Sequence, residues 1–390
     1  MKAIGIDIGT TSVCGILVDA ATGGVEKSVT KNSNAFIEGC AEWEKIQSVD
    51  KIMTVATDIL GSLMQESGDV GVIGVTGQMH GIVYTDKDGN AVSPLYTWQD
   101  GRGNQPYKDT TYAKYLNSFS GYGNVTDFYN TENGIKPESA VGYCTIHDYF
   151  VMRLCELKKP IMHTSDAASF GCYDLENNRF NYDCTAEITG DFRIAGEYKG
   201  IPVSVAIGDN QASVFSTLTD ENDVLVNVGT GSQISVISDK IADSAQIETR
   251  PYFEGKYLIV GAALCGGRAY SLLKNFYSEI FGYVKRLDDN QVYEIMNDML
   301  KNSSDDLFKV DTRFAGTRFD TNVRGSISEI TTENFTPSVL TYSVLCGMAD
   351  ELLDMYKKMN VSKSGIVGWV TGYGKTKHLL KSLKKSLAQR

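Results

Sequence analysis

Two stretches of this sequence decide its fold, and they carry nearly the same pattern. Residues 6–13 read IDIGTTSV, and residues 226–233 read VNVGTGSQ. Each copy is an alternating apolar run, a Gly-Thr turn and a second alternating run, which predicts a tight β-hairpin. Glycines let a ligand approach the backbone of such a turn, whose hydroxyl and N–H groups can receive phosphate oxygens. The repeat therefore predicts two related domains that hold a polyphosphate between them.

The composition describes a globular protein of two domains. The chain has 390 residues, of which 42% are hydrophobic and 22% charged, and a formal net charge of -11. This length exceeds one ordinary core, and the acidic balance argues against a nucleic-acid partner. No apolar stretch reaches membrane-spanning length. The cysteines are scattered and no signal-peptide pattern opens the chain, so we expect a cytoplasmic protein with reduced thiols and no membrane partner.

Hydrophobic periodicity predicts a mixed sheet in the first half of the chain. Strands are expected at 2–8, 12–19, 24–31 and 70–76, with an amphipathic helix over 46–64. A β-β-β-α-β order does not fit a plain dinucleotide-binding unit, whose sheet is parallel.

The second half repeats this order after a middle region rich in Tyr, Asn and Gly. We place the boundary between domains at residues 1–204 and 205–390, near the point where the pattern resumes. The elements expected in the middle and second half are a helix around 139–156, a strand at 201–207, a hairpin over 224–238, a strand at 257–264, helices at 269–281, 290–301 and 337–359, and a strand at 366–371.

Several local motifs lack the residues or the spacing that their usual functions require. Gly374-Lys375-Thr376 resembles the end of a P-loop, but the required upstream glycine is replaced by Trp369. Residues 86–90 resemble the start of a calcium loop but are better explained as a hairpin turn. The four histidines lack zinc-ligand spacing, and no nucleophile elbow supports a hydrolase.

Asp7 and Asp209 are the carboxylates with the most informative surroundings. Each follows an apolar strand and lies beside a glycine, so each is expected at a strand end. Either one alone is better explained as a turn or cap aspartate. Together with two Gly-Thr turns, they match the needs of phosphoryl transfer: a base, an acid that holds a metal, and N–H donors around the phosphates.

Two further segments fit a polyol pocket. Residues 77–81 (GQMHG) and 97–102 (TWQDGR) combine apolar bulk with hydrogen-bonding groups at short spacing. The alternatives are a buried, satisfied His80 in the first segment and a core Trp98 with polar surface neighbours in the second.

These residues resemble the FGGY family of carbohydrate kinases, whose fold belongs to the actin, sugar-kinase and Hsp70 group. The resemblance runs from residue 1 to about 380 and is closest to sedoheptulose kinases, with xylulose kinases next. It implies two actin-like, ribonuclease H-like α/β domains with a cleft between them, the first binding the sugar and the second the nucleotide. It is carried by residues 7–12, 77–81, 98–102, 165–168, 208–211, 229–232 and 266–267.

The resemblance also implies roles for individual residues. Asp209 would be the general base for a primary hydroxyl of the sugar, and Asp7 would position Mg²⁺. The residues implied for the sugar are Gln78, Met79, His80, Trp98, Asp100, Arg102 and Asn210. Those implied for ATP are Thr10, Thr11, Gly229, Thr230, Gly267, Gly372, Gly374 and His378.

Three positions depart from the pattern of the family. Cys14 stands where members usually carry a cation, and His378 stands where the adenosine loop usually carries Asn. The chain also stops at Arg390, where members usually continue through a final strand and helix.

We therefore expect an ATP- and Mg²⁺-dependent kinase that phosphorylates a ketose such as sedoheptulose or xylulose, and that forms a homodimer. One rival is a sugar-binding protein of the same fold that has lost catalysis. A second rival is a chaperone-like ATPase, which the two polyol-pocket segments disfavour.

Overall fold

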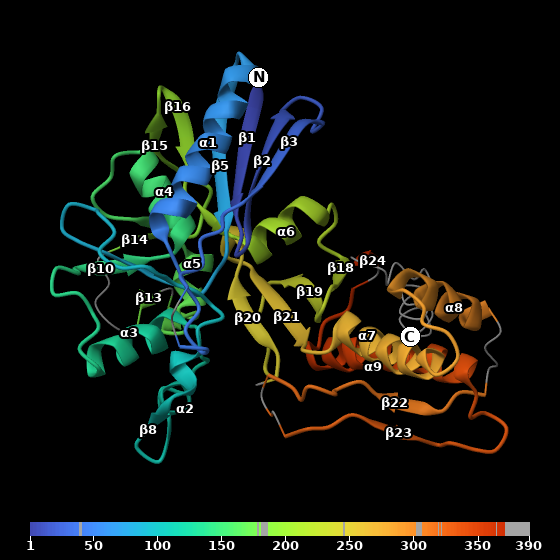
Figure 1. Cartoon of the computed structure of the whole chain (residues 1–390). Helices are drawn as coiled ribbons and strands as arrows, with labels where there is room; N and C mark the ends of the chain where they lie inside the picture. The colour runs from blue at the N-terminus through green and yellow to red at the C-terminus, as the bar shows by residue number, and fades with distance from the viewer. Residues whose placement is uncertain are drawn as a thin grey trace. The chain divides into compact units, whose positions relative to one another are not determined.

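The computed structural model describes most of the chain and divides it into two compact units (Figure 1). It describes residues 1–38, 41–177, 179–180, 186–244, 246–301, 306–318, 320, 322–363 and 365–370. Unit 1 comprises Met1–Ser213 and Arg250–Gly255, and unit 2 comprises Val214–Thr249 and Lys256–Arg390. The domain boundary placed between residues 204 and 205 stays a prediction.

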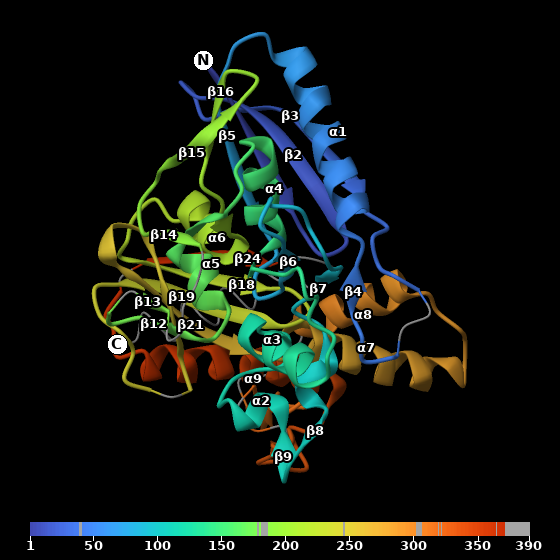
Figure 2. The ribbon, with the colours of Figure 1, turned by 90° about the vertical axis from the view of Figure 1, so that its left-hand side faces the viewer.

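Unit 1 is built on a seven-stranded mixed sheet in the order β15-β16-β5-β1-β2-β3, with β17 also paired to β5. β1 and β2 form an antiparallel hairpin, whereas β1 and β5 are parallel. Figure 2 shows β15 and β16 at one edge of this sheet. The strands are β1 (Lys2–Ile8), β2 (Ser12–Asp19), β3 (Val25–Asn32), β5 (Val70–Gly77), β15 (Ile194–Tyr198), β16 (Ile201–Ser204) and β17 (Ile207–Gly208).

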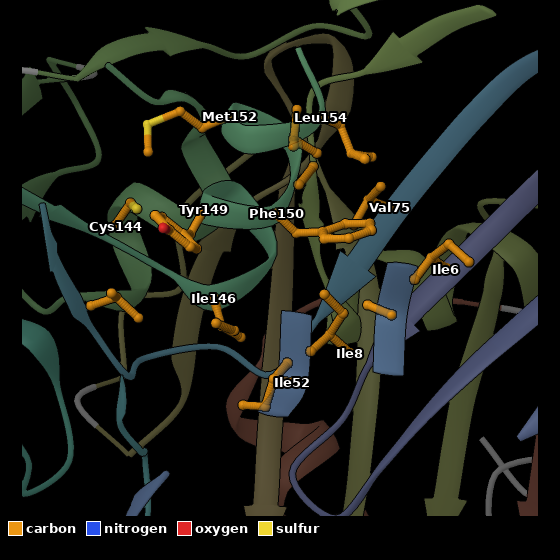
Figure 3. Packing of buried hydrophobic residues seen from close by; sticks show 14 of the residues in the cluster. Ile6, Ile8, Ile52, Val75, Cys144, Ile146, Tyr149, Phe150, Met152 and Leu154 are labelled. Atoms are coloured by element: carbon orange, nitrogen blue, oxygen red, sulfur yellow. The ribbon is translucent and has the colours of Figure 1, made fainter. Parts of the chain in front are cut away.

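The core of unit 1 lies between one face of this sheet and the helices α1 (Val49–Ser67) and α4 (Ile146–Leu154). Figure 3 shows Ile6 and Ile8 of β1, Val75 of β5 and Phe150 of α4 within one cluster. Strand side chains alternate between faces, so the residues between these positions point to the opposite face of the sheet. Asp7 is one of them.

The rest of unit 1 consists of short elements around this core. The short strands are β4 (Ile46–Gln47), β6 (Val83–Thr85), β7 (Leu95–Tyr96), β8 (Pro106–Tyr107), β9 (Thr110–Thr111), β10 (Gly142–Cys144), β11 (Ile161–His163), β12 (Tyr173–Asp174), β13 (Arg179–Phe180) and β14 (Glu187–Thr189). The helices are α2 (Tyr112–Tyr115), α3 (Gly123–Glu132), α5 (Thr164–Ser169), the 3₁₀ turns at Gly101–Asn104 and Phe253–Gly255, and α6 (Asp209–Thr217), which continues into unit 2.

Unit 2 repeats the topology of unit 1 around a five-stranded sheet in the order β20-β21-β19-β18-β24. β18 and β19 form the second hairpin, and β24 runs parallel to β18 as β5 runs parallel to β1. The helices α7, α8 and α9 close an apolar core with this sheet. The elements are β18 (Asp223–Val228), β19 (Ser232–Ser238), β20 (Glu248–Pro251), β21 (Tyr257–Ala263), α7 (Gly266–Gly282), α8 (Asp289–Lys301), β22 (Lys309–Asp311), β23 (Ser326–Ser328), α9 (Pro337–Lys358) and β24 (Gly365–Val370).

The sequence predicted both hairpins correctly but misjudged three helices. The region expected to be helical around 139–156 contains strand β10 before α4, which begins only at Ile146. The helix expected from residue 46 begins at Val49, because Ile46 and Gln47 pair with β7 and the Ser48 hydroxyl caps the helix by accepting from the Lys51 N–H. Helix α6, which begins at Asp209, was not predicted. Among the helices of the described residues, none combines the length and apolar character needed to cross a bilayer.

Candidate active site

Three strands of unit 1 end together and bring the two predicted carboxylates to one edge of the sheet. β5 runs parallel to both β1 and β17, and Gly77 at its end lies beside Ile8 and Gly208. Asp7 precedes the end of β1, and Asp209 follows Gly208 directly. Because the carboxyl ends of parallel strands share one edge, both acids lie where α/β folds place their ligands.

Asp209 is the first residue of α6 and has an unusually basic carboxyl. Its side chain is accessible to solvent, yet protein atoms fill most of the volume around it. The resulting desolvation raises the pKa of Asp209 to about 6, with a smaller contribution from the charge of Asp7, while His147 and Arg250 act in the opposite direction. Such a carboxyl is ionised at neutral pH and is more basic than an ordinary aspartate, which suits a general base.

Asp7 has a different environment at the same edge. Its side chain reaches solvent, but the surrounding protein partly desolvates the carboxyl and raises its pKa, while His147 acts to lower it. A solvent-accessible carboxylate is the hard oxygen ligand that Mg²⁺ prefers. Cys14 lies directly opposite Asp7 in the β1–β2 ladder, so the two side chains share a face of the sheet.

A buried histidine with two carboxyls lies close enough to act electrostatically on these acids. The His147 Nε2 lies 3.0 Å from Oδ1 of Asp166, and the Thr145 hydroxyl donates to Asp148 across 2.7 Å. Burial lowers the pKa of His147, and it raises the pKa values of Asp148 and Asp166 well above their usual range. The pair His147–Asp166 is therefore held in its neutral forms by its surroundings.

The sequence-based prediction missed this cluster, although a signal for it exists. His147 and Asp148 interrupt the apolar run of α4, and an interrupted apolar run often marks buried polar partners. One ligand-type atom from each of His147, Asp148 and Asp166 lies within 4.8 Å of the others. Within the described residues, Nδ1 of His147, Oδ1 of Asp148 and Oδ2 of Asp166 have no hydrogen-bond partner.

Four side chains around the first Gly-Thr turn form one hydrogen-bond network. The Thr10 hydroxyl accepts from the Trp98 indole N–H at 2.9 Å and donates to Oε1 of Gln78 at 3.3 Å. The Gln47 amide donates to the Thr10 carbonyl at 2.6 Å and accepts from the Gln78 amide at 3.1 Å. The structure thus brings the predicted nucleotide residue Thr10 together with two predicted sugar residues. Gln47 was not predicted.

His80 is held in a strained backbone conformation next to this network. Its φ is 72°, in the left-handed region that side chains rarely adopt. Its backbone N–H donates to the Ser169 hydroxyl at 3.1 Å, and its ring Nδ1 lies 2.8 Å from the Ser169 carbonyl oxygen. That oxygen can only accept, so Nδ1 carries the proton. The ring also stacks on Tyr122, with centroids 4.2 Å apart.

Met79 lies directly against the backbone of Gly208, which precedes Asp209. The side chain is buried, and a Cβ added to Gly208 would lie 2.5 Å from the Met79 sulfur. A Cβ added to Gly81 would likewise lie 2.5 Å from the carbonyl oxygen of Tyr96. Gly81 is therefore needed for close approach to the Tyr96 backbone, and residues 77–81 pack tightly against their neighbours.

The side chains of Asp100 and Arg102 form a buried ion pair. Both side chains are about 1% exposed, and the guanidinium binds the two carboxylate oxygens at 2.6 and 3.2 Å. Arg102 also donates to the Asn130 side chain and lies 4.1 Å from the Tyr96 ring centroid. Asp100 accepts from the Lys45 N–H. Their predicted contact with sugar stays a prediction; the contacts they make in the structure hold the Trp98 loop.

Asn210 and its neighbour anchor the start of α6. The Asn210 side-chain oxygen accepts from Arg250 at 3.1 Å, and the buried Gln211 amide donates to the Pro251 carbonyl at 3.0 Å. Both contacts join α6 to the short segment of unit 1 that lies after residue 249.

The second Gly-Thr turn contacts the N-terminus of α7 in unit 2. The Gly267 N–H donates to the Gly229 carbonyl at 2.8 Å, and the Arg268 N–H donates to the Thr230 carbonyl at 3.0 Å. The turn and a helix N-terminus thus gather three predicted nucleotide residues, and such termini favour phosphate. Gly372, Gly374 and His378 lie outside the described residues.

A cavity of about 580 Å³ in unit 2 contains none of the predicted site residues. It lies between α9 and the β22–β23 pair, and its lining includes Asp311, Asp350, Glu351 and Asp354. Such an acid-rich lining is unsuited to a polyphosphate.

Comparison with known proteins identifies the family. Residues 2–191 match the sequence model of the N-terminal domain of the FGGY family of carbohydrate kinases. The chain is 27% identical to a sedoheptulokinase of Mus musculus, over 93% of this chain and 87% of that protein. The sequence thus matches the FGGY family of carbohydrate kinases over residues 2–191. Its identity with a xylulose kinase of Lactococcus lactis is lower, at 24% over 93% of this chain and 77% of that protein.

The FGGY fold is also shown by solved structures. A xylulose kinase from Rhodospirillum rubrum superposes with a TM-score of 0.85 over 99% of this chain and 85% of that one, at 17% identity. The two repeated units thus have the actin-like fold of sugar kinases. The protein is a carbohydrate kinase, an enzyme class that phosphorylates sugars with ATP.

Proposed function

We propose that this enzyme phosphorylates a primary hydroxyl of a ketose, either sedoheptulose or a similar sugar such as xylulose. The chain is more similar to a sedoheptulokinase than to a xylulose kinase, which supports sedoheptulose as the first candidate substrate and xylulose as the second. The observation that carries the proposal is the basic carboxyl of Asp209, at the same strand edge as Asp7 and the Trp98–Gln78 network.

In the proposed step, Asp209 accepts the proton of the sugar hydroxyl as that oxygen attacks the γ-phosphorus of ATP. A new bond forms between the sugar oxygen and phosphorus, and the bond from phosphorus to the β–γ bridging oxygen breaks, which releases ADP. Desolvation makes the Asp209 carboxylate a better base without neutralising it at pH 7.

Mg²⁺ and the nucleotide are assigned to the two Gly-Thr turns. Asp7 would hold Mg²⁺, which neutralises charge on the phosphate oxygens when bound. Only the first turn begins with an acid, since Asn227 stands at the matching position of the second. Thr11 and Thr230, with the backbone of their turns, would donate to phosphate oxygens. Gly267 would leave room for adenosine, together with the predicted Gly372, Gly374 and His378.

The sugar is assigned to residues 1–204, joined by Asn210, and the nucleotide mainly to residues 205–390. Gln78, Met79, His80, Trp98 and Asn210 would contact the sugar, whereas Asp100 and Arg102 would hold the Trp98 loop in place. Cytoplasmic location and a homodimer complete the proposal. Twofold homodimers are the commonest oligomers, and light scattering of the purified protein tests this one.

The test measures sugar-dependent ADP release over a panel of ketoses. Asp209→Ala removes the base and should abolish turnover, and Asp209→Asn should do the same while preserving volume. Trp98 is 44% exposed at the site, so quenching of its fluorescence reports sugar binding independently of turnover. Trp98→Phe is the control that assigns the signal. Full sugar-dependent turnover by Asp209→Ala would refute the assignment of the base.

One observation favours a second candidate, a sugar-binding protein with impaired catalysis. Cys14 lies beside Asp7 where FGGY members usually carry a cation, so this side of the site has less positive charge. This candidate predicts quenching of Trp98 by a ketose but no ADP release. Cys14→Lys should then restore turnover, whereas Cys14→Ser should not.

A further inference from the structure

Helix α5 lies between residues 77–81, which are proposed to contact the sugar, and Gly208, which precedes the proposed base Asp209. Although it spans only Thr164–Ser169, it contacts both through hydroxyl groups. The Ser165 hydroxyl accepts from the Gly208 N–H at 3.1 Å, in the residue before Asp209. The Ser169 hydroxyl accepts from the His80 N–H at 3.1 Å.

The Ser165 contact is one step of a chain with defined proton positions. The His163 Nε2 lies 3.3 Å from the Gly190 carbonyl oxygen, which can only accept, so Nε2 carries the proton. Nδ1 therefore accepts, from the Ser165 N–H at 3.1 Å and from the Ser165 hydroxyl at 2.8 Å. The Ser165 oxygen is thereby oriented to accept from Gly208, in a buried environment where losing a partner is costly.

The Ser169 contact holds the acceptor side in the same way. The Ser169 hydroxyl donates to the Asp166 carbonyl at 2.7 Å, which leaves its lone pairs for the His80 N–H. The Ser169 carbonyl takes the His80 ring proton as well. These two contacts stabilise a residue whose positive φ is unfavourable on its own.

We propose that Ser165 and Ser169 are positioning residues that set the distance between the base and the bound sugar, Ser165 through Gly208 and Ser169 through His80. The proposal rests on the proposed function, in which Asp209 is the base and His80 contacts the sugar. Proximity catalysis is sensitive to small displacements, because a shift of about 1 Å can cost on the order of a hundredfold in rate. Two hydroxyls on one short helix therefore control the alignment.

The test compares two serine variants that should fail differently. Ser165→Ala releases the backbone of the base, so kcat should fall roughly 10- to 100-fold with little change in the KM for sugar. Ser169→Ala releases His80, so the KM for sugar should rise roughly 5- to 30-fold with a smaller change in kcat. Ser165→Thr and Ser169→Thr keep the hydroxyl and should recover most of each loss.

Ser67→Ala is the matched control. Its hydroxyl is also buried and donates to the Met64 carbonyl at 3.0 Å, away from the strand ends. A loss of general stability would lower the melting temperature and the active fraction in all three alanine variants. It would not lower mainly kcat in Ser165→Ala while raising mainly the KM for sugar in Ser169→Ala.

A measurement on the unmodified protein tests the same contact. Amide hydrogen exchange should show the Gly208 N–H protected to the level of strand amides, and Ser165→Ala should remove that protection. Rapid exchange at Gly208 in the unmodified protein, or wild-type kcat in Ser165→Ala, overturns the proposal. Turnover by Asp209→Ala would instead overturn the proposed base, whatever the result at Ser165.

Discussion

Lowering the pH should switch off sugar phosphorylation through protonation of Asp209. Desolvation by the surrounding protein raises the pKa of this carboxyl to about 6, so roughly half of the free enzyme carries the ionised base at pH 6 and about one tenth at pH 5. An unperturbed aspartate would still be ionised in about nine tenths of the molecules at pH 5. The kcat/KM for sugar should therefore fall about tenfold for each pH unit below the midpoint.

The assay is kcat/KM for sugar from roughly pH 4.5 to roughly pH 8.5, with saturating ATP and excess Mg²⁺ so that the nucleotide keeps its charge. The groups that act on Asp209 are His147, Asp7 and Arg250. The positive charge of Arg250 lowers the pKa of Asp209, so Arg250→Gln should move the midpoint to higher pH. Arg153→Gln is the control, because the Arg153 guanidinium donates to the Gly89 carbonyl and is not among the groups that act on Asp209. A midpoint near pH 4 would refute the reasoning.

The same shift has a consequence for stability that an independent measurement can check. The folded state binds the Asp209 proton more tightly than the unfolded state, so the ionised carboxyl destabilises the fold above about pH 6. Asp209→Asn should raise the melting temperature at pH 7 and above. This gain should fade between about pH 6 and about pH 4, as the wild-type carboxyl takes up its proton. A gain that does not vary with pH would contradict a raised pKa of Asp209 in the folded state.

Three further results are expected. Arg102→Met should lower the free energy of unfolding in urea by about 3–5 kcal/mol, because it leaves the buried Asp100 unpaired, and adding Asp100→Asn should recover most of the loss. Gly267→Ala should raise the KM for ATP, because its Cβ would lie 2.5 Å from a carbonyl oxygen of the Gly-Thr turn, whereas Gly282→Ala, with open space around it in the same helix, should not. Chelation of divalent cations should stop turnover but not quenching by sugar, and Asp7→Asn should raise the Mg²⁺ requirement roughly tenfold or more. The first expectation is contradicted if Arg102→Met leaves the urea midpoint unchanged. The second is contradicted if Gly267→Ala and Gly282→Ala have equal KM values for ATP, and the third if the enzyme turns over in EDTA.

The sequence predicted the two sheets well because their signals are local. Alternating apolar residues on both sides of a Gly-Thr turn specify a hairpin within about fifteen residues of chain. The hairpin strands β1 and β2 match their predicted bounds, and β18 and β19 fall within the predicted hairpin. Both halves of the repeat were found for the same reason.

The middle of the chain could not be predicted in the same way. Its strands are two or three residues long and pair with distant partners, as β10 does with β6 and β11 with β14. Such short segments carry no period, so their structure depends on tertiary contacts. Helix α6 was missed because its polar first turn, residues 209–211, resembles a loop after a strand.

The candidate site was predicted where sequence motifs carry it and missed where packing does. Asp7 and Asp209 were expected at strand ends because of the apolar runs beside them, and the structure places both at one edge of the sheet. The pairing of Asp100 with Arg102 could have been suspected from their spacing of two residues, but not their burial. His147 and Asp166 are 19 residues apart and meet only because α4 and α5 pack together.

The close approach at Gly81 and Gly208 bears on how the sugar range of this enzyme can be altered in the laboratory. Gly81 has no room for a Cβ because it faces the backbone of Tyr96 and Thr97, and a Cβ at Gly208 would force the Met79 side chain to move. Random libraries that include these glycines would lose most clones to misfolding. Variation placed at Trp98, whose side chain is 44% exposed, would change the proposed sugar pocket without altering the packing of Met79 against Gly208. A search for new sugar acceptors should begin there.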